Sequence, residues 1–161
     1  IASCYSWALK NHIKDKNTDG YNKLKDEIQK KNLPFAEKML LNSDMSLYWS
    51  AKDWSNYALT SVKYVEKFGK EDYNTLNNIA WAFYENISDA IMLEKAAGWA
   101  KHSIELNPRY FNHDTYAAVL YKLGKKQEAQ TAAERAIDLA KKEGTDYGST
   151  QELLTKIKAM K

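Results

Sequence analysis

Residues 76–83 read LNNIAWAF, and the same helical pattern returns at residues 113–120 as HDTYAAVL. Each copy is followed by a second segment that carries small residues three or four positions apart. This spacing places the small residues on one face of a helix. Two such units predict stacked helical hairpins. Proteins of this architecture act by presenting a surface, so the repeat favours binding over catalysis.

The second copy has the more regular spacing. Ala117 is the small residue of its first helix, and Gly124 ends that helix. Three further small residues follow at Ala129, Ala133 and Ala136, spaced by four and by three. Small side chains on that face let the paired helices approach closely. The spacing predicts a hairpin over residues 110–141.

The first copy carries Ala80 in its first helix and ends at Pro108, which cannot continue a helix. Its second helix has small residues at Ala96, Ala100 and Ser103. The first-helix alanines of the two copies are 37 positions apart, but the second-helix alanines are 33 apart. Because insertions in repeats usually fall in loops, we predict a hairpin over 73–108 with an extended loop.

Three weaker segments flank these copies. Residues 38–70 read as a degraded repeat, with Tyr57 and Tyr64 where small residues are expected. Residues 1–33 predict two helices, either a further decayed hairpin, which we favour, or a linker from a missing N-terminal domain. Ser149 and Glu152 have the spacing of a capping box and predict a final helix over 149–160. That helix is expected to cover the last repeat, although a ligand could occupy the same position.

These residues resemble the tetratricopeptide repeat family, most closely over 73–141 and more loosely over 38–70. The family pattern is a helix-turn-helix of about 34 residues with small residues at fixed offsets and a closing proline. The resemblance implies an all-α fold, an α-α superhelix of about three helical hairpins plus a C-terminal capping helix. We treat residues 1–161 as one such domain.

A narrower resemblance links residues 114–125 to the helical part that follows a thioredoxin-like domain in some bacterial envelope proteins. It implies a periplasmic or cell-envelope location; without it a cytoplasmic one is expected. The chain itself has no Cys-x-x-Cys motif, because Cys4 is its only cysteine. It begins at Ile1, so we expect a mature product or a piece of a longer protein.

Composition limits the classes of partner. The 24 basic and 21 acidic residues are intermixed and leave a net charge of +3. The densest lysine pairs lie at predicted helix ends, where cations complement the helix dipole. A nucleic-acid surface is therefore the less favoured interpretation. The longest strongly apolar run, residues 79–84, is far shorter than the ~20 residues of a membrane span.

The sequence contains no recognisable catalytic or metal-binding pattern. His12, His102 and His113 are not paired at short spacing, so a zinc site is not expected. Neither a G-x-S-x-G elbow nor a phosphate-binding loop occurs. Glu134 and Asp138 lie one turn apart, but they read as a solvated helix face. We predict that the chain is not an enzyme and needs no metal or cofactor.

The family resemblance places a binding groove on the first helices of the hairpins. Three of its aromatic positions, Trp49, Tyr84 and Tyr121, are 35 and 37 residues apart. Such side chains offer rigid contact area to a peptide, whereas Trp81 and the tyrosines could instead simply pack between repeats. The predicted groove residues are Asn42, Ser46, Trp49, Asn77, Trp81, Tyr84, Asp114, Tyr121 and Lys122.

The pattern therefore predicts a protein-interaction module that binds a protein or peptide segment in this groove. Family members that clamp a terminal carboxylate use cations, which are missing at the corresponding positions of this chain. Lysines beside tyrosines, such as Lys122 beside Tyr121, motivate an alternative in which a helical repeat binds single-stranded nucleic acid. In a third alternative the helices dimerise or brace an absent thioredoxin-like catalytic domain.

Overall fold

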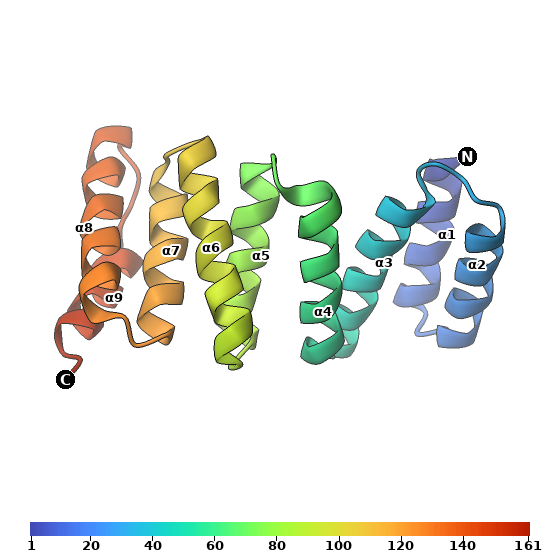
Figure 1. The fold of residues 1–161 in the computed structure, drawn as a ribbon, viewed down its shortest axis with the longest axis horizontal. Coiled ribbons are helices and arrows are strands. Elements are labelled where there is room, and N and C mark those ends of the chain that lie inside the picture. The colour runs from blue at the N-terminus through green and yellow to red at the C-terminus, as the bar shows by residue number, and fades with distance from the viewer. The chain divides into compact units, whose positions relative to one another are not determined.

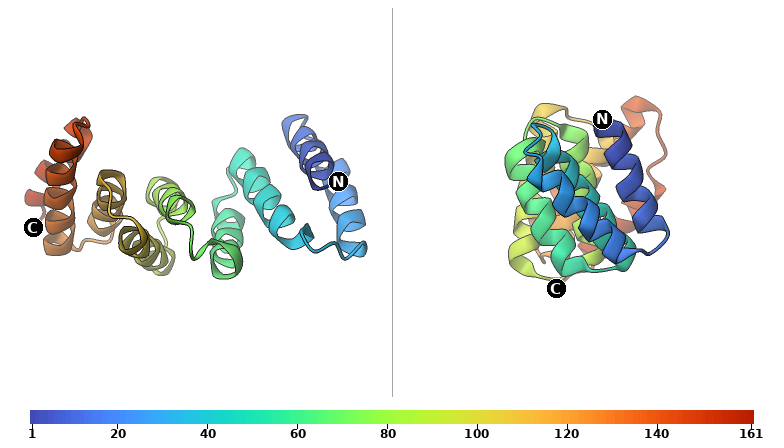
Figure 2. Two further views of the ribbon diagram at one scale, coloured as in Figure 1. Left: turned by 90° about the horizontal axis from the view of Figure 1, so that it is seen from above. Right: turned by 90° about the vertical axis from the view of Figure 1, so that its right-hand side faces the viewer.

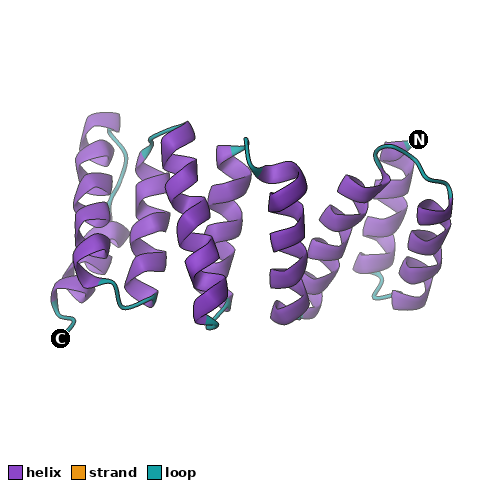
Figure 3. Ribbon diagram, viewed as in Figure 1, coloured by secondary structure: helices purple, strands orange, loops and turns teal.

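The structure is a computed structural model that describes residues 1–161. It consists of helices joined by short loops, with no strand, so the all-α prediction is confirmed (Figure 3). The helices are α1 (Ala2–Lys14), α2 (Thr18–Lys30), α3 (Ala36–Ala51), α4 (Trp54–Tyr64), α5 (Tyr73–Asn86), α6 (Ala90–Leu106), α7 (Tyr110–Lys122), α8 (Lys126–Glu143) and α9 (Gly148–Lys158). Their contacts divide the chain into two units, Ile1–Phe68 and Gly69–Lys161.

Unit 1 contains two hairpins, α1 with α2 and α3 with α4 (Figure 1). The N-terminal pair packs as the predicted hairpin, and α1 also contacts α3. Its core is built from buried Leu9, Tyr21, Ile28 and Leu40. The Tyr21 hydroxyl donates a hydrogen bond of 2.9 Å to the buried carboxylate of Asp44. A π-helical turn, Val65–Gly69, continues directly from α4.

Unit 2 contains the hairpins α5 with α6 and α7 with α8, and α7 also packs against α5 and α6. All the small residues predicted for its second helices are fully buried: Ala96, Ala100, Ser103, Ala129, Ala133 and Ala136. Helix α9 lies against α8 and α7, as predicted for a capping helix (Figures 1 and 2). Its buried Leu154 and Ile157 face that contact.

The extended loop predicted for residues 73–108 is wrong. Residues 87–89 join α5 to α6, and a loop of the same length, residues 123–125, joins α7 to α8. The additional residues lengthen the helices instead, mostly at the start of α6. The reason is the cap at Asp89, whose carboxylate accepts the Met92 backbone N–H at 2.9 Å and starts α6 about one turn earlier.

The capping box predicted at Ser149 and Glu152 is also wrong. Helix α9 begins at Gly148, with Tyr147 at the cap position and no side-chain cap. Ser149 therefore lies inside the first turn. The Gly148 backbone N–H donates instead to Asp146, at 3.2 Å. Helices α2, α4 and α5 do follow the usual preference for Asn and Asp at the cap position, with Asn17, Asp53 and Asp72.

Candidate functional site

The predicted groove residues fall into both units. Helix α5 carries Asn77, Trp81 and Tyr84 at intervals of four and three, so these side chains share one face. Helix α7 carries Asp114 and Tyr121 at the same relative positions, followed by Lys122. Because α5 packs against α7, the six predicted residues of unit 2 belong to two neighbouring helices. We call them the α5/α7 face.

Aromatic rings form the centre of the α5/α7 face. The rings of Trp81 and Tyr84 pack with centroids 5.1 Å apart and planes inclined at 49°. Both side chains, and that of Tyr121, are half-buried. The pKa of the Tyr84 phenol is raised, first by burial and then by the negative charges that Tyr121 and Asp114 carry when ionised. Tyr84 therefore lies close to both α7 residues.

Lys122 bridges the two helices of this face. Its Nζ atom donates a hydrogen bond of 2.6 Å to the backbone carbonyl of Tyr84. The same ammonium lies 5.8 Å from the centroid of the Tyr84 ring, within the range of a cation–π interaction. Partial desolvation lowers the pKa of Lys122. The lysine predicted for a ligand is thus engaged within the chain.

Asp114 is anchored by residues that the sequence analysis did not identify. Its carboxylate accepts a hydrogen bond of 2.6 Å from the Thr150 hydroxyl of α9. Because Thr150 donates to Asp114, the Tyr110 hydroxyl, 2.8 Å from the Thr150 oxygen, is the donor in that contact. Burial raises the pKa of Asp114, and the hydrogen bond from Thr150 partly opposes this rise. No local pattern around Thr150 indicates this role.

Asn77 is the most deeply placed polar residue of the face. Its side chain is buried, with 7% of its surface exposed, and its Oδ1 atom has no hydrogen-bond partner. A buried amide oxygen without a partner is costly, on the order of 1–3 kcal/mol. A water molecule beside this oxygen would remove the cost, because the oxygen itself has almost no surface that a bound segment could reach.

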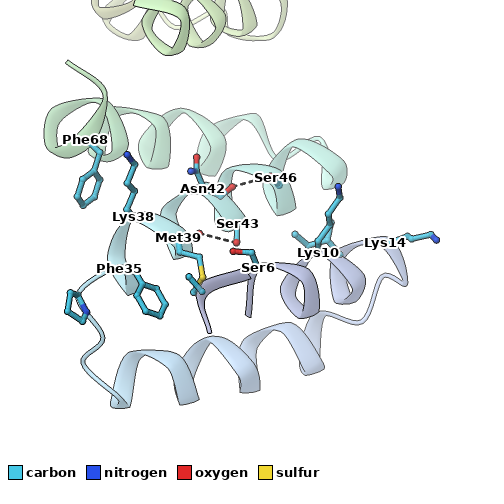
Figure 4. A pocket seen from close by; sticks show the side chains of 13 residues that line it. Ser6, Lys10, Lys14, Phe35, Lys38, Met39, Asn42, Ser43, Ser46 and Phe68 are labelled. Carbon is cyan, nitrogen blue, oxygen red and sulfur yellow. Dashed lines mark hydrogen bonds between the residues drawn. The ribbon is translucent and has the colours of Figure 1, made fainter. Parts of the chain in front are cut away.

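The predicted groove residues of unit 1 all lie on α3, but in different surroundings. Trp49 packs against Trp54 and Tyr57 of its own hairpin, with ring centroids 5.2 and 5.4 Å apart. It remains partly exposed. Asn42 and Ser46 line a hollow of about 770 Å³ between α1 and α3 (Figure 4). No residue of α1 is among the predicted groove residues, because the sequence of residues 1–33 leaves their role open.

Within residues 1–161, no cluster of His, Cys, Asp or Glu side chains is arranged to hold a metal ion. No helix has the length and apolar character that a membrane span requires. Comparison with known proteins gives no match to a family model, to a curated protein or to a solved structure.

Proposed function

We propose that the chain is a non-enzymatic protein-interaction module, and that the α5/α7 face binds a segment of a partner protein. The observation that carries the proposal is the group of three half-buried aromatic side chains, Trp81, Tyr84 and Tyr121, on two packed helices. Aromatic side chains of this kind dominate the binding energy of many protein interfaces. Their partial burial already limits their rotamers, so little further entropy is lost on binding.

Polar groups beside these rings would set the orientation of the bound segment. Asp114 is a carboxylate held in position by Thr150, whereas the Asn77 oxygen is buried beneath the surface of the face. The Asp114 carboxylate suits the backbone N–H groups of a peptide. Lys122 donates its hydrogen bond to the Tyr84 carbonyl, so its role in this proposal is to hold Tyr84 in position and not to contact the ligand.

The resemblance to tetratricopeptide repeats supports the same proposal, since it places the first helices of the hairpins in the binding groove. The narrower resemblance of residues 114–125 to helical parts of thioredoxin-like envelope proteins suggests a setting for this function, the periplasm or cell envelope. On this view the partner is a protein of that compartment or a thioredoxin-like domain of the same protein.

Site-specific photo-crosslinking would test the proposal. A photoreactive phenylalanine analogue at Tyr121 should cross-link a partner in cells, and the same analogue at Ile91 should not, because Ile91 is 71% exposed and lies on α6. The variant W81A/Y84A/Y121A should lose the partner, whereas I91A/L106A, which removes exposed side chains elsewhere in unit 2, should retain it. Circular dichroism would establish that both variants are folded. Equal cross-linking from the two positions would contradict the proposal.

The nucleic-acid alternative predicts a different result. The lysine that motivates it, Lys122, already donates a hydrogen bond to the Tyr84 carbonyl. Phosphate contacts strengthen as salt falls, so affinity for single strands would be much higher at ~50 mM salt than at ~200 mM. If the chain bound single strands tightly at low salt, and if W81A/Y84A/Y121A lost that binding, the partner of the α5/α7 face would be a nucleic acid and not a protein.

A further inference from the structure

Unit 1 contains a long hollow between α1 and α3, which closes at one end against Phe68 of the π-helical turn (Figure 4). On α1 its lining runs from Ala2 to Lys14, and on the other side it runs from Phe35, the residue before α3, to Ser46 within that helix. At 1.5 Å per residue these stretches are about 18 and 16 Å long. The hollow thus follows the helices for about three turns, which suits an elongated occupant.

The charge of this hollow is of one sign. Lys10, Lys14 and Lys38 line it, and no carboxylate does. None of the three lysines forms an ion pair within the chain, and the neighbouring carboxylate of Glu37 is already paired with Lys67. Three unpaired cations along one hollow favour an anionic occupant.

Apolar side chains supply the rest of the lining. Phe35, Met39 and Phe68 are each half-buried and reach the hollow. The Lys38 ammonium lies 6.0 Å from the centroid of the Phe68 ring, so cationic and apolar groups are adjacent. An occupant that matches this lining has an apolar side and acidic groups beside it.

We propose that the hollow binds an acidic amphipathic segment of a partner protein, with apolar residues against Phe35, Met39 and Phe68 and carboxylates paired with the lysines. This site lies wholly within unit 1. It is separate from the α5/α7 face and does not depend on the function proposed for that face.

The placement of the lysines favours a peptide over a lipid headgroup. Lys10 and Lys14 lie at one end of the hollow, and Lys38 lies at the other, beside Phe68 (Figure 4). A single phosphate group reaches only one of these ends. A peptide with acidic residues several positions apart reaches both, and it gains from each pair.

Selection from a peptide library would test this site. A random library of about 15-residue peptides displayed on phage is selected against the wild-type chain and against two variants. Each variant replaces three lysines by glutamine, so the two variants have equal net charge. One variant, K10Q/K14Q/K38Q, removes the lysines of the hollow. The control, K23Q/K30Q/K63Q, removes exposed lysines of unit 1 outside the hollow. Circular dichroism and thermal unfolding would compare the folds of the three proteins.

The expected result is enrichment of peptides with Asp or Glu flanking apolar residues. Synthetic copies of these peptides should bind K10Q/K14Q/K38Q about tenfold more weakly than the wild-type chain, but the control variant about equally. Amide resonances of residues 2–14 and 35–46 should shift on binding. The W81A/Y84A/Y121A variant should bind the same peptides as the wild-type chain. The experiment therefore distinguishes a failure of the proposal for the hollow from a failure of the function proposed for the α5/α7 face.

Three results would overturn the proposal. They are a selection that enriches no peptide above the bare support, one that enriches peptides without acidic residues, and one that enriches acidic peptides that bind both lysine variants equally. Vesicles of phosphatidylglycerol and phosphatidylcholine provide the lipid comparison. Vesicle binding that requires Lys10, Lys14 and Lys38, in the absence of peptide enrichment, would assign the hollow to a membrane surface instead.

Discussion

Asp114 illustrates how one side chain depends on a distant one. It lies on α7, and its partner Thr150 lies 36 residues further along on α9. The contact holds a carboxylate in a partly buried position beside Tyr84, and it also ties α9 to the α5/α7 face. The capping helix therefore does more than cover apolar surface, because it positions a residue of the candidate site.

The titration of Asp114 gives a prediction for stability. Burial raises its pKa above the usual 3.8, so the native state holds this proton more tightly than the unfolded chain. The free energy of unfolding should therefore fall as pH rises from about 3.8 through the native pKa. Asp114→Asn does not titrate, so it should gain stability relative to the wild type across this window, and the difference should level off above it.

Urea unfolding of both proteins at several pH values between about 3.5 and 7 measures that difference. The same change at the exposed Asp138 separates the effect from that of removing a surface charge. A wild-type-to-variant difference that stays constant, or that shrinks with rising pH, would show that the Asp114 proton is not held by the fold.

At the scale of elements, the small residues of α8 control how closely neighbouring helices pack. Ala129, Ala133 and Ala136 have no exposed surface, and α8 packs against both α7 and α9. In α6 the position that corresponds to Ala136 is occupied by Ser103. The Ser103 hydroxyl donates a hydrogen bond of 2.8 Å to the Tyr73 carbonyl. A small position can thus also carry a specific polar contact.

Enlarging one of these residues should separate the helices. Ala133→Leu should cost about 1–3 kcal/mol of unfolding free energy, because the closely packed helices leave no space for three more carbons. Asp138→Leu adds the same side chain on the exposed side of α8 and should change stability by about 0.5 kcal/mol or less. Chemical denaturation measures both. Equal effects of the two changes would contradict close packing at Ala133.

At the scale of the whole molecule, the chain folds as two units with their own cores. Unit 1 is built around Leu9, Tyr21 and Ile28, and unit 2 around the buried alanines together with residues such as Phe83 and Leu120. Each hairpin contacts its neighbours within the unit, and stability in such arrays is approximately a sum of local terms. Each unit should therefore retain its fold when the other is absent.

Expression of residues 69–161 alone tests this expectation. The fragment should show a helical circular dichroism spectrum and a cooperative thermal transition, because its helices bury their apolar faces against one another. Residues 1–68 should behave likewise. A fragment that is unstructured alone but helical in the full chain would show that the units depend on each other.

The sequence alone accounts for the paired helices of residues 73–141, but it leaves the role of residues 1–33 open. Alanines at helical spacing, Gly124 and Pro108 are local signals, and they were sufficient to predict the hairpins. They did not locate the extra residues of the first repeat, because the cap at Asp89 decides where α6 begins. The position of a cap depends on which side chain reaches a free backbone N–H, and helical periodicity does not report that.

The tertiary structure determines which side chains meet. It brought Thr150 to Asp114, placed Lys122 on the carbonyl of Tyr84, and lined one hollow with Lys10 and Lys38 from helices far apart in sequence. The physical reason is that spacing along a helix fixes the face on which a residue lies. The residues opposite that face depend on how the helices pack, which no single segment of the sequence records.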